Sequence, residues 1–267
     1  MKLLKENYDT VLLTFLKDPE IQDAINNKDF DTVYKKITNI NIIPQITALF
    51  LQIGINPLDY LDYVPEYYLC FNKDITSITI PSNIKKINSA AFQGCKNLIK
   101  IEIPDSVTDI GSHAFAQCEN LKSIKLPNSI TVIDVFAFTD CYNLKIIGLP
   151  ENLTDISYYA FCNCHELEKI KLPDTLEYIG KHAFDNCGNL KYIIIPENVV
   201  TIDEFAFYDC GSLTNITIPR KTTHIGWGAF NGCNDYLKLC IPNHLRGKFY
   251  RQNRLTYQKY KSTITWY

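Results

Sequence analysis

Two spacings of apolar residues divide the chain into a short first part and a long second part. In residues 3–17 the apolar positions recur at three- and four-residue steps, which is the spacing of an amphipathic helix. From residue 76 onward, a short alternation of the type Ile-x-Ile, as in residues 101–103, returns every 23 residues. Such alternation places two side chains of each segment on one side of a strand. The chain is therefore predicted to pass from short helices into a long series of short strands.

Three further columns of identical residues keep the same 23-residue step. Proline ends each strand, because it has no N–H to continue a hydrogen-bonded ladder. Phenylalanine and cysteine follow at fixed distances. The members are Pro81, Pro104, Pro127, Pro150, Pro173, Pro196, Pro219 and Pro242; Phe92, Phe115, Phe138, Phe161, Phe184, Phe207 and Phe230; and Cys95, Cys118, Cys141, Cys164, Cys187, Cys210 and Cys233. This register predicts one supersecondary unit stacked seven times, with each unit burying its apolar face against the next.

The equivalent strands are predicted to stack in parallel. Each unit has a single Ile-x-Ile segment, so a set of hairpins would leave every strand without an antiparallel partner. Apolar residues three and six positions after the proline, such as Val107 and Ile110, wind the chain back along the opposite side. An alanine before every phenylalanine, such as Ala114, is small enough to let adjacent coils approach. The predicted fold class is a repeat solenoid of parallel strands at a 23-residue period.

The unit, with Ile-Pro, Ile-Gly or Ile-Asp, Ala-Phe and Cys at fixed places, resembles the BspA-like leucine-rich repeats, also described as the Treponema pallidum type. The resemblance covers residues 76–242. It departs from the pattern at Thr222, where an aliphatic residue is expected, and at Tyr236, where leucine is expected. The resemblance implies a curved leucine-rich repeat solenoid that is used for protein–protein contact, with no catalytic residues to carry over. Many members of that family look like cell-surface proteins.

Both ends of the array are predicted to carry caps, because a solenoid exposes a cross-section of its core at each end. Residues 1–60 are predicted to form a small α-helical cap of three to four short helices. Asp18 precedes a helix that begins at Pro19, Asp29 precedes the next, and Gly54 ends the last. Residues 61–75 are interpreted as a degenerate first coil, residues 76–242 as seven units, and residues 243–267 as a basic, aromatic cap or tail. The helical segment is either only a cap or also a second interaction domain.

The seven cysteines of the column lie inside an apolar pattern. A buried free cysteine behaves as a small hydrophobe, so these residues are predicted to be reduced and structural. Cys162, Cys164 and His165 form the only local cluster that invites zinc. The one-residue gap between its cysteines and the inward direction of Cys164 argue against a zinc site. No metal or cofactor is therefore expected.

Charge is distributed unevenly along the chain. The net charge is −2, yet residues 236–267 carry seven Lys and Arg and no Asp or Glu. This stretch also contains Tyr250, Tyr257 and Trp266, and we interpret it as an amphipathic cap whose aromatic residues cover the last coil. The alternative is a segment that binds an acidic polymer or membrane surface. The acidic character of the remaining chain and the lack of a nucleic-acid motif argue against a nucleic-acid partner.

Location is predicted from two further features. The first residues lack the uninterrupted apolar run of a signal peptide, and no stretch approaches the ~20 apolar residues of a spanning helix. No transmembrane segment is expected, and a cytoplasmic location is predicted. The alternative is a cell-surface or secreted protein that leaves by a non-classical route.

Function is expected on residues that vary between units and point outward from the strands. No phosphate-binding loop, HExxH motif or GxSxG motif occurs, so an enzyme is not expected. Apolar and aromatic side chains amid lysines favour a protein partner, which the lysines predict to be acidic. The predicted partner-binding residues are Lys125, Ile146, Lys169, Lys171, Tyr192 and Ile194. The chain is thus predicted to be a protein-interaction scaffold. The rival interpretations are a surface adhesin or antigen and a binder that acts through its basic tail.

Overall fold

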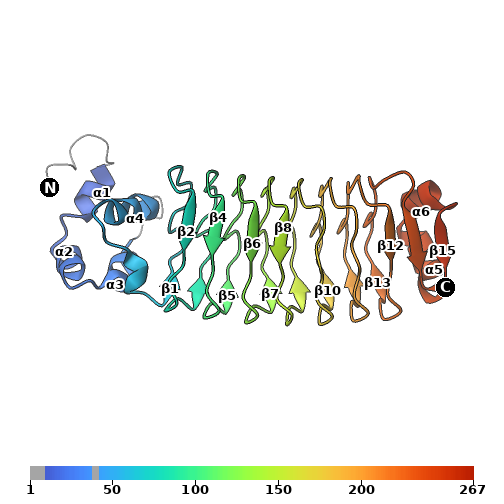
Figure 1. Cartoon of the computed structure of the whole chain (residues 1–267), viewed down its shortest axis with the longest axis horizontal. Helices are drawn as coiled ribbons and strands as arrows, with labels where there is room; N and C mark the ends of the chain where they lie inside the picture. The colour runs from blue at the N-terminus through green and yellow to red at the C-terminus, as the bar shows by residue number, and fades with distance from the viewer. Residues whose placement is uncertain (1–9, 38–41) are drawn as a thin grey trace.

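The protein is an elongated solenoid with helices at its N-terminal end and a mixed cap at its C-terminal end (Figure 1). A computed structural model describes residues 10–37 and 42–267. The first helices are α1 (Thr10–Phe15), α2 (Pro19–Asn26), α3 (Phe30–Lys35) and α4 (Ile43–Gln52), followed by the 3₁₀ turn η3 (Pro57–Asp59). The part of the predicted first helix that precedes residue 10 lies outside the described residues.

Capping residues place these helices as predicted. The Asp18 side chain accepts a hydrogen bond from the Glu20 N–H at 2.8 Å, and Asp29 accepts one from the Thr32 N–H at 3.1 Å. Each carboxylate satisfies an N–H that has no partner within its helix and interacts favourably with the helix dipole. Gly54, with φ of 80°, follows the end of α4 in the left-handed conformation that glycine adopts without strain.

Most of the predicted strands form a ladder that we call the front ladder. Two predicted strands, at residues 169–171 and 192–194, do not form, and only an isolated bridge joins Lys169 to Tyr192 there. The members of the front ladder are β2 (Ser77–Thr79), β4 (Lys100–Glu102), β6 (Ser123–Lys125), β8 (Ile146–Gly148), β12 (Asn215–Thr217), β14 (Lys238–Ile241) and β15 (Ile264–Trp266). Every pair in it is parallel, and repeat strands pair at a shift of 23 residues, as in Ser123 with Ile146. The parallel solenoid is therefore confirmed, and with a coil added at each end it has about nine turns.

A second ladder, which the sequence did not predict, runs along the solenoid where each chain segment returns. Its strands are two residues long: β1 (Tyr63–Val64), β3 (Lys86–Ile87), β5 (Asp109–Ile110), β7 (Val132–Ile133), β9 (Asp155–Ile156), β10 (Tyr178–Ile179), β11 (Thr201–Ile202) and β13 (His224–Ile225). One residue of each pair points inward and is buried. Two residues are too few to show an alternating pattern, so the signal was not visible in the sequence.

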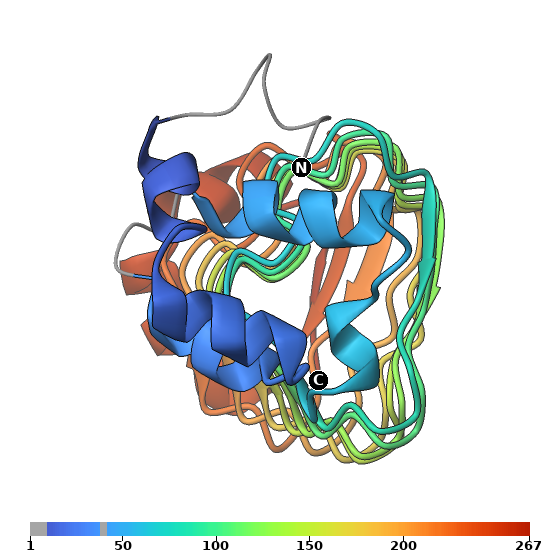
Figure 2. The ribbon, with the colours of Figure 1, turned by 90° about the vertical axis from the view of Figure 1, so that its left-hand side faces the viewer.

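The interior is a continuous stack of phenylalanine rings. Consecutive rings from Phe92 to Phe230 lie 5.3–5.7 Å apart between centroids and within 12° of parallel. These rings and the preceding alanines are fully buried. Seen along the axis, the coils superimpose, and the N-terminal helices lie across the near end (Figure 2). Each coil therefore buries its ring only against its two neighbours, as expected of a repeat array.

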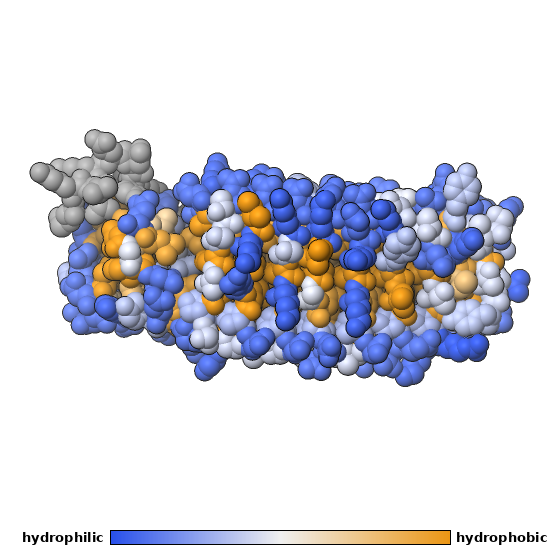
Figure 3. All heavy atoms as spheres, viewed as in Figure 1, coloured by the Kyte–Doolittle hydropathy of each residue, from blue (hydrophilic) through white to orange (hydrophobic). Residues whose placement is uncertain are grey.

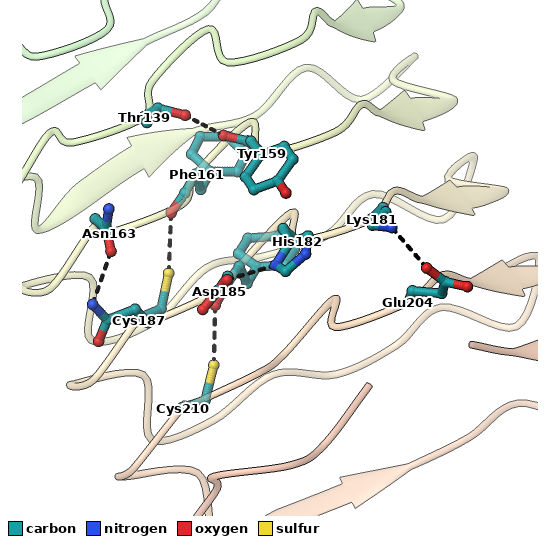
Figure 4. Close-up of polar contacts among 12 residues, drawn as sticks. Thr139, Tyr159, Phe161, Asn163, Lys181, His182, Asp185, Cys187, Glu204 and Cys210 are labelled. Carbon is teal, nitrogen blue, oxygen red and sulfur yellow. Dashed lines mark hydrogen bonds and ion pairs between the residues drawn. The ribbon is translucent and has the colours of Figure 1, made fainter. Parts of the chain in front are cut away.

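Each thiol of the cysteine column donates a hydrogen bond to a main-chain carbonyl of the preceding coil. The Cys187 sulfur lies 3.3 Å from the Phe161 oxygen (Figure 4), and the Cys118 sulfur lies 3.2 Å from the Phe92 oxygen. Burial raises the pKa of the Cys95 thiol to about 12 and that of Cys118 well above its usual range. The thiols of the column therefore join neighbouring coils through hydrogen bonds, and the inward orientation of the column is confirmed.

Native-state alkylation is expected to distinguish Cys240 from this column. Cys240 is partly exposed, whereas Cys118 and Cys187 are fully buried and kept protonated. Because the thiolate is the reactive form, iodoacetamide at about pH 8 should label Cys240 first and reach the column only after denaturation. Peptide mass spectrometry of timed samples checks this order. Labelling of Cys118 in the native protein at the rate of Cys240 would contradict the assignment.

The last coil corrects one sequence interpretation. Tyr236 occupies the position of the expected leucine by count, but its side chain is exposed, and Leu237 is the buried residue. The N–H of Leu237 bonds to the Asn234 oxygen at 3.0 Å, whereas that of Leu213 bonds to the Cys210 oxygen. The turn before β14 is thus shifted by one residue, and leucine keeps its interior place. Thr222, the other departure, is buried with its hydroxyl bonded to the Val199 oxygen at 2.8 Å.

The C-terminal cap follows β14 and consists of the 3₁₀ turn η4 (Asn243–Leu245), α5 (Arg246–Gln252), α6 (Arg254–Tyr260) and β15. Phe249 and Tyr260 are buried against the last coil. The Tyr260 hydroxyl donates to the Cys233 oxygen at 2.9 Å, and the Asn253 side chain accepts from the Gly228 N–H at 2.9 Å. The apolar side of this basic stretch therefore closes the core.

Candidate protein-binding face

The outward side of the front ladder, which we call the front face, carries all six predicted partner-binding residues. Lys125 and Ile146 lie on the paired strands β6 and β8, and Lys169 is bridged to Tyr192. Lys171 and Ile194 lie two residues farther along the same two coils. All six side chains are exposed. Figure 3 shows this face with a hydrophobic strip along the strands, crossed by hydrophilic side chains.

The apolar members of the patch are exposed to an unusual degree. Ile194 is 83% exposed, more than any other large apolar side chain in the described part of the chain, and Tyr192 and Ile146 are 67% and 61% exposed. Their neighbours along the strands, Ile147 and Ile193, are buried. Alternation alone thus sets which isoleucines face water. Exposed aliphatic and aromatic groups that lie close together are typical of a binding surface.

The front ladder is interrupted between β8 and β12, where Lys169, Lys171, Tyr192 and Ile194 lie. The Leu126 N–H bonds to the Gly148 oxygen, and the Ile80 N–H bonds to the Glu102 oxygen, both at 2.9 Å. The equivalent amides of Ile103, Leu149, Leu172 and Ile195 have no such bond to the next coil among the described residues. Between β8 and β12 the face is held by one isolated bridge, so adjacent coils are less tightly joined there.

Two shallow grooves flank the patch. One, of about 310 Å³, lies between the coils of β4 and β6 and is lined by Lys125 and Leu126. The other, of about 260 Å³, lies between the coil of Ile194 and β12. A partner side chain would find apolar walls there, next to the exposed isoleucine or lysine.

The lysines give the patch a positive charge that other side chains leave unneutralised. Lys125, Lys169 and Lys171 have no carboxylate within 4 Å in residues 10–37 and 42–267. By contrast, Lys100 on the same face is paired with Glu102 at 2.6 Å. Unpaired surface lysines retain their hydration and their field, which favours an acidic partner.

A second regular feature, which the sequence did not predict, lies in the turn after the second ladder. Five aromatic rings stack there at 4.5–4.8 Å between centroids, each from a residue with φ of 55–58°. They are His113, Phe136, Tyr159, His182 and Phe205. The sequence does carry a signal for this row, because an aromatic residue or histidine stands two positions before five successive phenylalanines of the column. Stacking offsets part of the cost of left-handed backbone at non-glycine residues, so this row stabilises the array.

Titratable groups in and near that row form hydrogen bonds and ion pairs with neighbouring side chains. His182 Nδ1 lies 2.6 Å from Asp185 Oδ2, while Lys181 pairs with Glu204 at 2.8 Å (Figure 4). Burial raises the pKa of Asp185, and the bond to His182 opposes that rise. Within the described residues, no group of three or more His, Cys, Asp or Glu side chains is placed to hold a metal ion. None of the helices there is both long and apolar enough to cross a membrane.

The repeat geometry agrees with a known family. The model of the BspA type leucine rich repeat region matches residues 64–173 and 154–265. The chain belongs to this family. The matched residues run from β1 into the C-terminal cap. Solenoids of this kind are generally non-catalytic. No curated protein matches the chain.

Solved structures of bacterial proteins are similar to this chain. A T. pallidum leucine rich repeat protein is 30% identical over 69% of this chain and 85% of that protein, with a TM-score of 0.59. A leucine rich cell surface protein from Faecalibacterium prausnitzii is 28% identical over 68% of this chain, with a TM-score of 0.50. The chain spans 58% of that protein and 46% of a Eubacterium ventriosum leucine-rich repeat protein, which is 29% identical over 64% of this chain with a TM-score of 0.57.

Proposed function

We propose that this protein is a non-catalytic interaction module that binds an acidic protein partner through the front face. The observation that carries this proposal is the patch of Ile146, Tyr192 and Ile194, exposed beside unpaired lysines where the front ladder is interrupted. Burying two such side chains stabilises a complex by a few kcal/mol, about 1.5–3 kcal/mol each. Tyrosine, here Tyr192, is enriched among the residues that contribute most of the binding energy of interfaces.

We further propose that the module acts at the cell surface. The support is its likeness to a bacterial protein described as a leucine rich cell surface protein. The sequence features had favoured a cytoplasmic location, which stays an untested prediction. Surface biotinylation of intact host cells separates the two locations: labelling of the protein beside an unlabelled cytoplasmic marker supports the surface, and protection from the reagent supports the cytoplasm.

Replacing Tyr192 and Ile194 by serine is expected to reduce partner capture at least tenfold without loss of folding. Both side chains are mainly exposed, so the thermal transition should stay within a few degrees of the parent. The measurement is capture from host cell-envelope extract on immobilised protein, quantified by mass spectrometry. Partners that count are those retained by the parent and lost by the variant.

A matched control removes an exposed tyrosine and an exposed aliphatic residue from elsewhere on the solenoid. Tyr158 and Val200 are 47% and 40% exposed and lie near the second ladder. Tyr158→Ser with Val200→Ser should capture as the parent does. Equal capture by the front-face variant and the parent would rule out the front face as the binding surface.

A further inference from the structure

The C-terminal cap concentrates positive charge at one end of the rod. Residues 236–267 hold seven basic residues and no acidic ones, whereas residues 71–235 hold 14 basic and 19 acidic residues. Helices α5 and α6 lie at the end of the solenoid, beyond the last repeat strand (Figure 1). Six of the seven basic residues lie in this cap, and the seventh, Lys238, lies on β14 of the front ladder.

The two cap helices have an inner side and an outer side. Phe249, Thr256 and Tyr260 are buried on the inner side against the last coil. Arg251 lies two residues from Phe249, and Arg254 lies two from Thr256, so helical geometry directs both away from the coil. Lys261 follows directly after α6 and is exposed. The outer side is thus basic.

Some basic residues of the cap are already engaged. Lys259 pairs with Asp235 at 2.8 Å, Lys248 donates to the Thr223 oxygen at 3.1 Å, and Arg246 lies over the Trp266 ring at 5.5 Å. Arg251, Arg254 and Lys261 have no carboxylate within 4 Å among the residues that the structure describes. These three charges remain available to an external anion.

Apolar groups lie among these free charges. Leu255 is 63% exposed and directly follows Arg254, and Tyr250 is 51% exposed and directly precedes Arg251. Tyr250 is held edge-on against Tyr257, with centroids 4.9 Å apart. An exposed leucine beside arginines is favourable at a bilayer surface, where phosphates meet acyl chains, and tyrosine prefers the same depth. A soluble polyanion would satisfy the arginines but not the leucine.

We propose that the outer side of α5 and α6 docks end-on to a membrane surface rich in anionic phospholipid. Arg251, Arg254 and Lys261 contact lipid phosphates, while Leu255 and Tyr250 enter the headgroup region. In this orientation the rod projects from the membrane, and the front face stays open along its side. Membrane docking is therefore independent of the proposed protein binding.

Vesicle co-sedimentation of the full chain tests the proposal. Vesicles of phosphatidylcholine with about one third phosphatidylglycerol should bind the protein, and vesicles of phosphatidylcholine alone should bind at least tenfold less. Raising the salt from about 0.1 M to about 1 M, which shortens the screening length from about 10 Å to about 3 Å, should release it. Arg251→Gln with Arg254→Gln should weaken binding about thirtyfold, and Leu255→Ser should weaken it at unchanged charge.

The matched control is Lys169→Gln with Lys171→Gln, which removes the same charge from the front face and should bind vesicles as the parent does. Parent-like binding by the arginine variant, or equal binding to both vesicle types, would overturn the proposal. So would full competition by soluble polyphosphate together with no effect of Leu255→Ser, since this result identifies a polyanion site. Tyr192→Ser with Ile194→Ser should keep vesicle binding. Failure of the protein-binding proposal would therefore appear as unchanged partner capture by this variant, whereas failure of the membrane proposal would appear in the vesicle measurements.

Discussion

Phe161→Ala is expected to lower the free energy of unfolding by about 3–5 kcal/mol, the range for removing a fully buried aromatic ring. Phe161 is completely buried in the middle of the ring stack, 5.4 Å between centroids from both Phe138 and Phe184. The substitution leaves a cavity between two coils that each depend on the same ring. Because coils contact only their neighbours, the loss weakens both adjoining interfaces.

Urea unfolding followed by far-ultraviolet circular dichroism measures this change. The matched control is Tyr192→Ala, an aromatic residue of the adjacent region that is mainly exposed, and its effect should stay within about 0.5 kcal/mol. If the two halves of the array then unfold at different urea concentrations, the unfolding transition of Phe161→Ala should also be broader than that of the parent. A loss below about 1 kcal/mol for Phe161→Ala would mean that the rings do not hold the coils together.

Tyr260→Ala is expected to destabilise the C-terminal end by about 3 kcal/mol or more. Tyr260 is the last residue of α6 in the cap. Its ring is fully buried, and its hydroxyl is bonded to the Cys233 oxygen. Removing it leaves that carbonyl without its tyrosine donor and opens the last coil to water. Since an array without a sound cap loses structure from its end inward, the effect should be local before it is global.

Hydrogen–deuterium exchange resolves this local effect. Amides of β12 and β14 should exchange faster in Tyr260→Ala, while those of β4 and β6 stay protected as in the parent. Tyr250→Ala provides the control, because Tyr250 lies on the same pair of helices but is half exposed. If both substitutions change exchange equally, or neither does, the cap does not close the core through Tyr260.

Much of the fold was predictable because a repeat imposes the same environment on equivalent residues. Phe161 and Cys164 recur in every unit, so each had to occupy a site that is identical from coil to coil, which only the interior provides. The second ladder was not predictable, because strands as short as Asp155–Ile156 carry no periodic signal. The one-residue shift that buries Leu237 was not predicted either, since a strict 23-residue count places Tyr236 at the buried position.

The outward direction of the candidate side chains was predictable, but the hydrogen bonding around them was not. Alternation along a strand places Tyr192 and Ile194 outward, and the structure shows both exposed. The alternation in the sequence does not predict that the ladder is interrupted between β8 and β12, because hydrogen bonding between coils depends on small shifts of the backbone. Side chains on this face are not required by the core, so the repeat does not determine which residues occupy it.

Site-specific photocrosslinking most directly tests the claim that function resides on the front face while the repeated columns form the scaffold. A benzophenone amino acid is placed at Tyr192, on the front face. In the control it is placed at Val200, which is exposed next to β11 of the second ladder. On cell-envelope extract, the variant at Tyr192 should form a discrete crosslinked product that excess unlabelled parent protein abolishes. The variant at Val200 should form none. The opposite pattern, with the competed product at Val200 and none at Tyr192, would contradict the account.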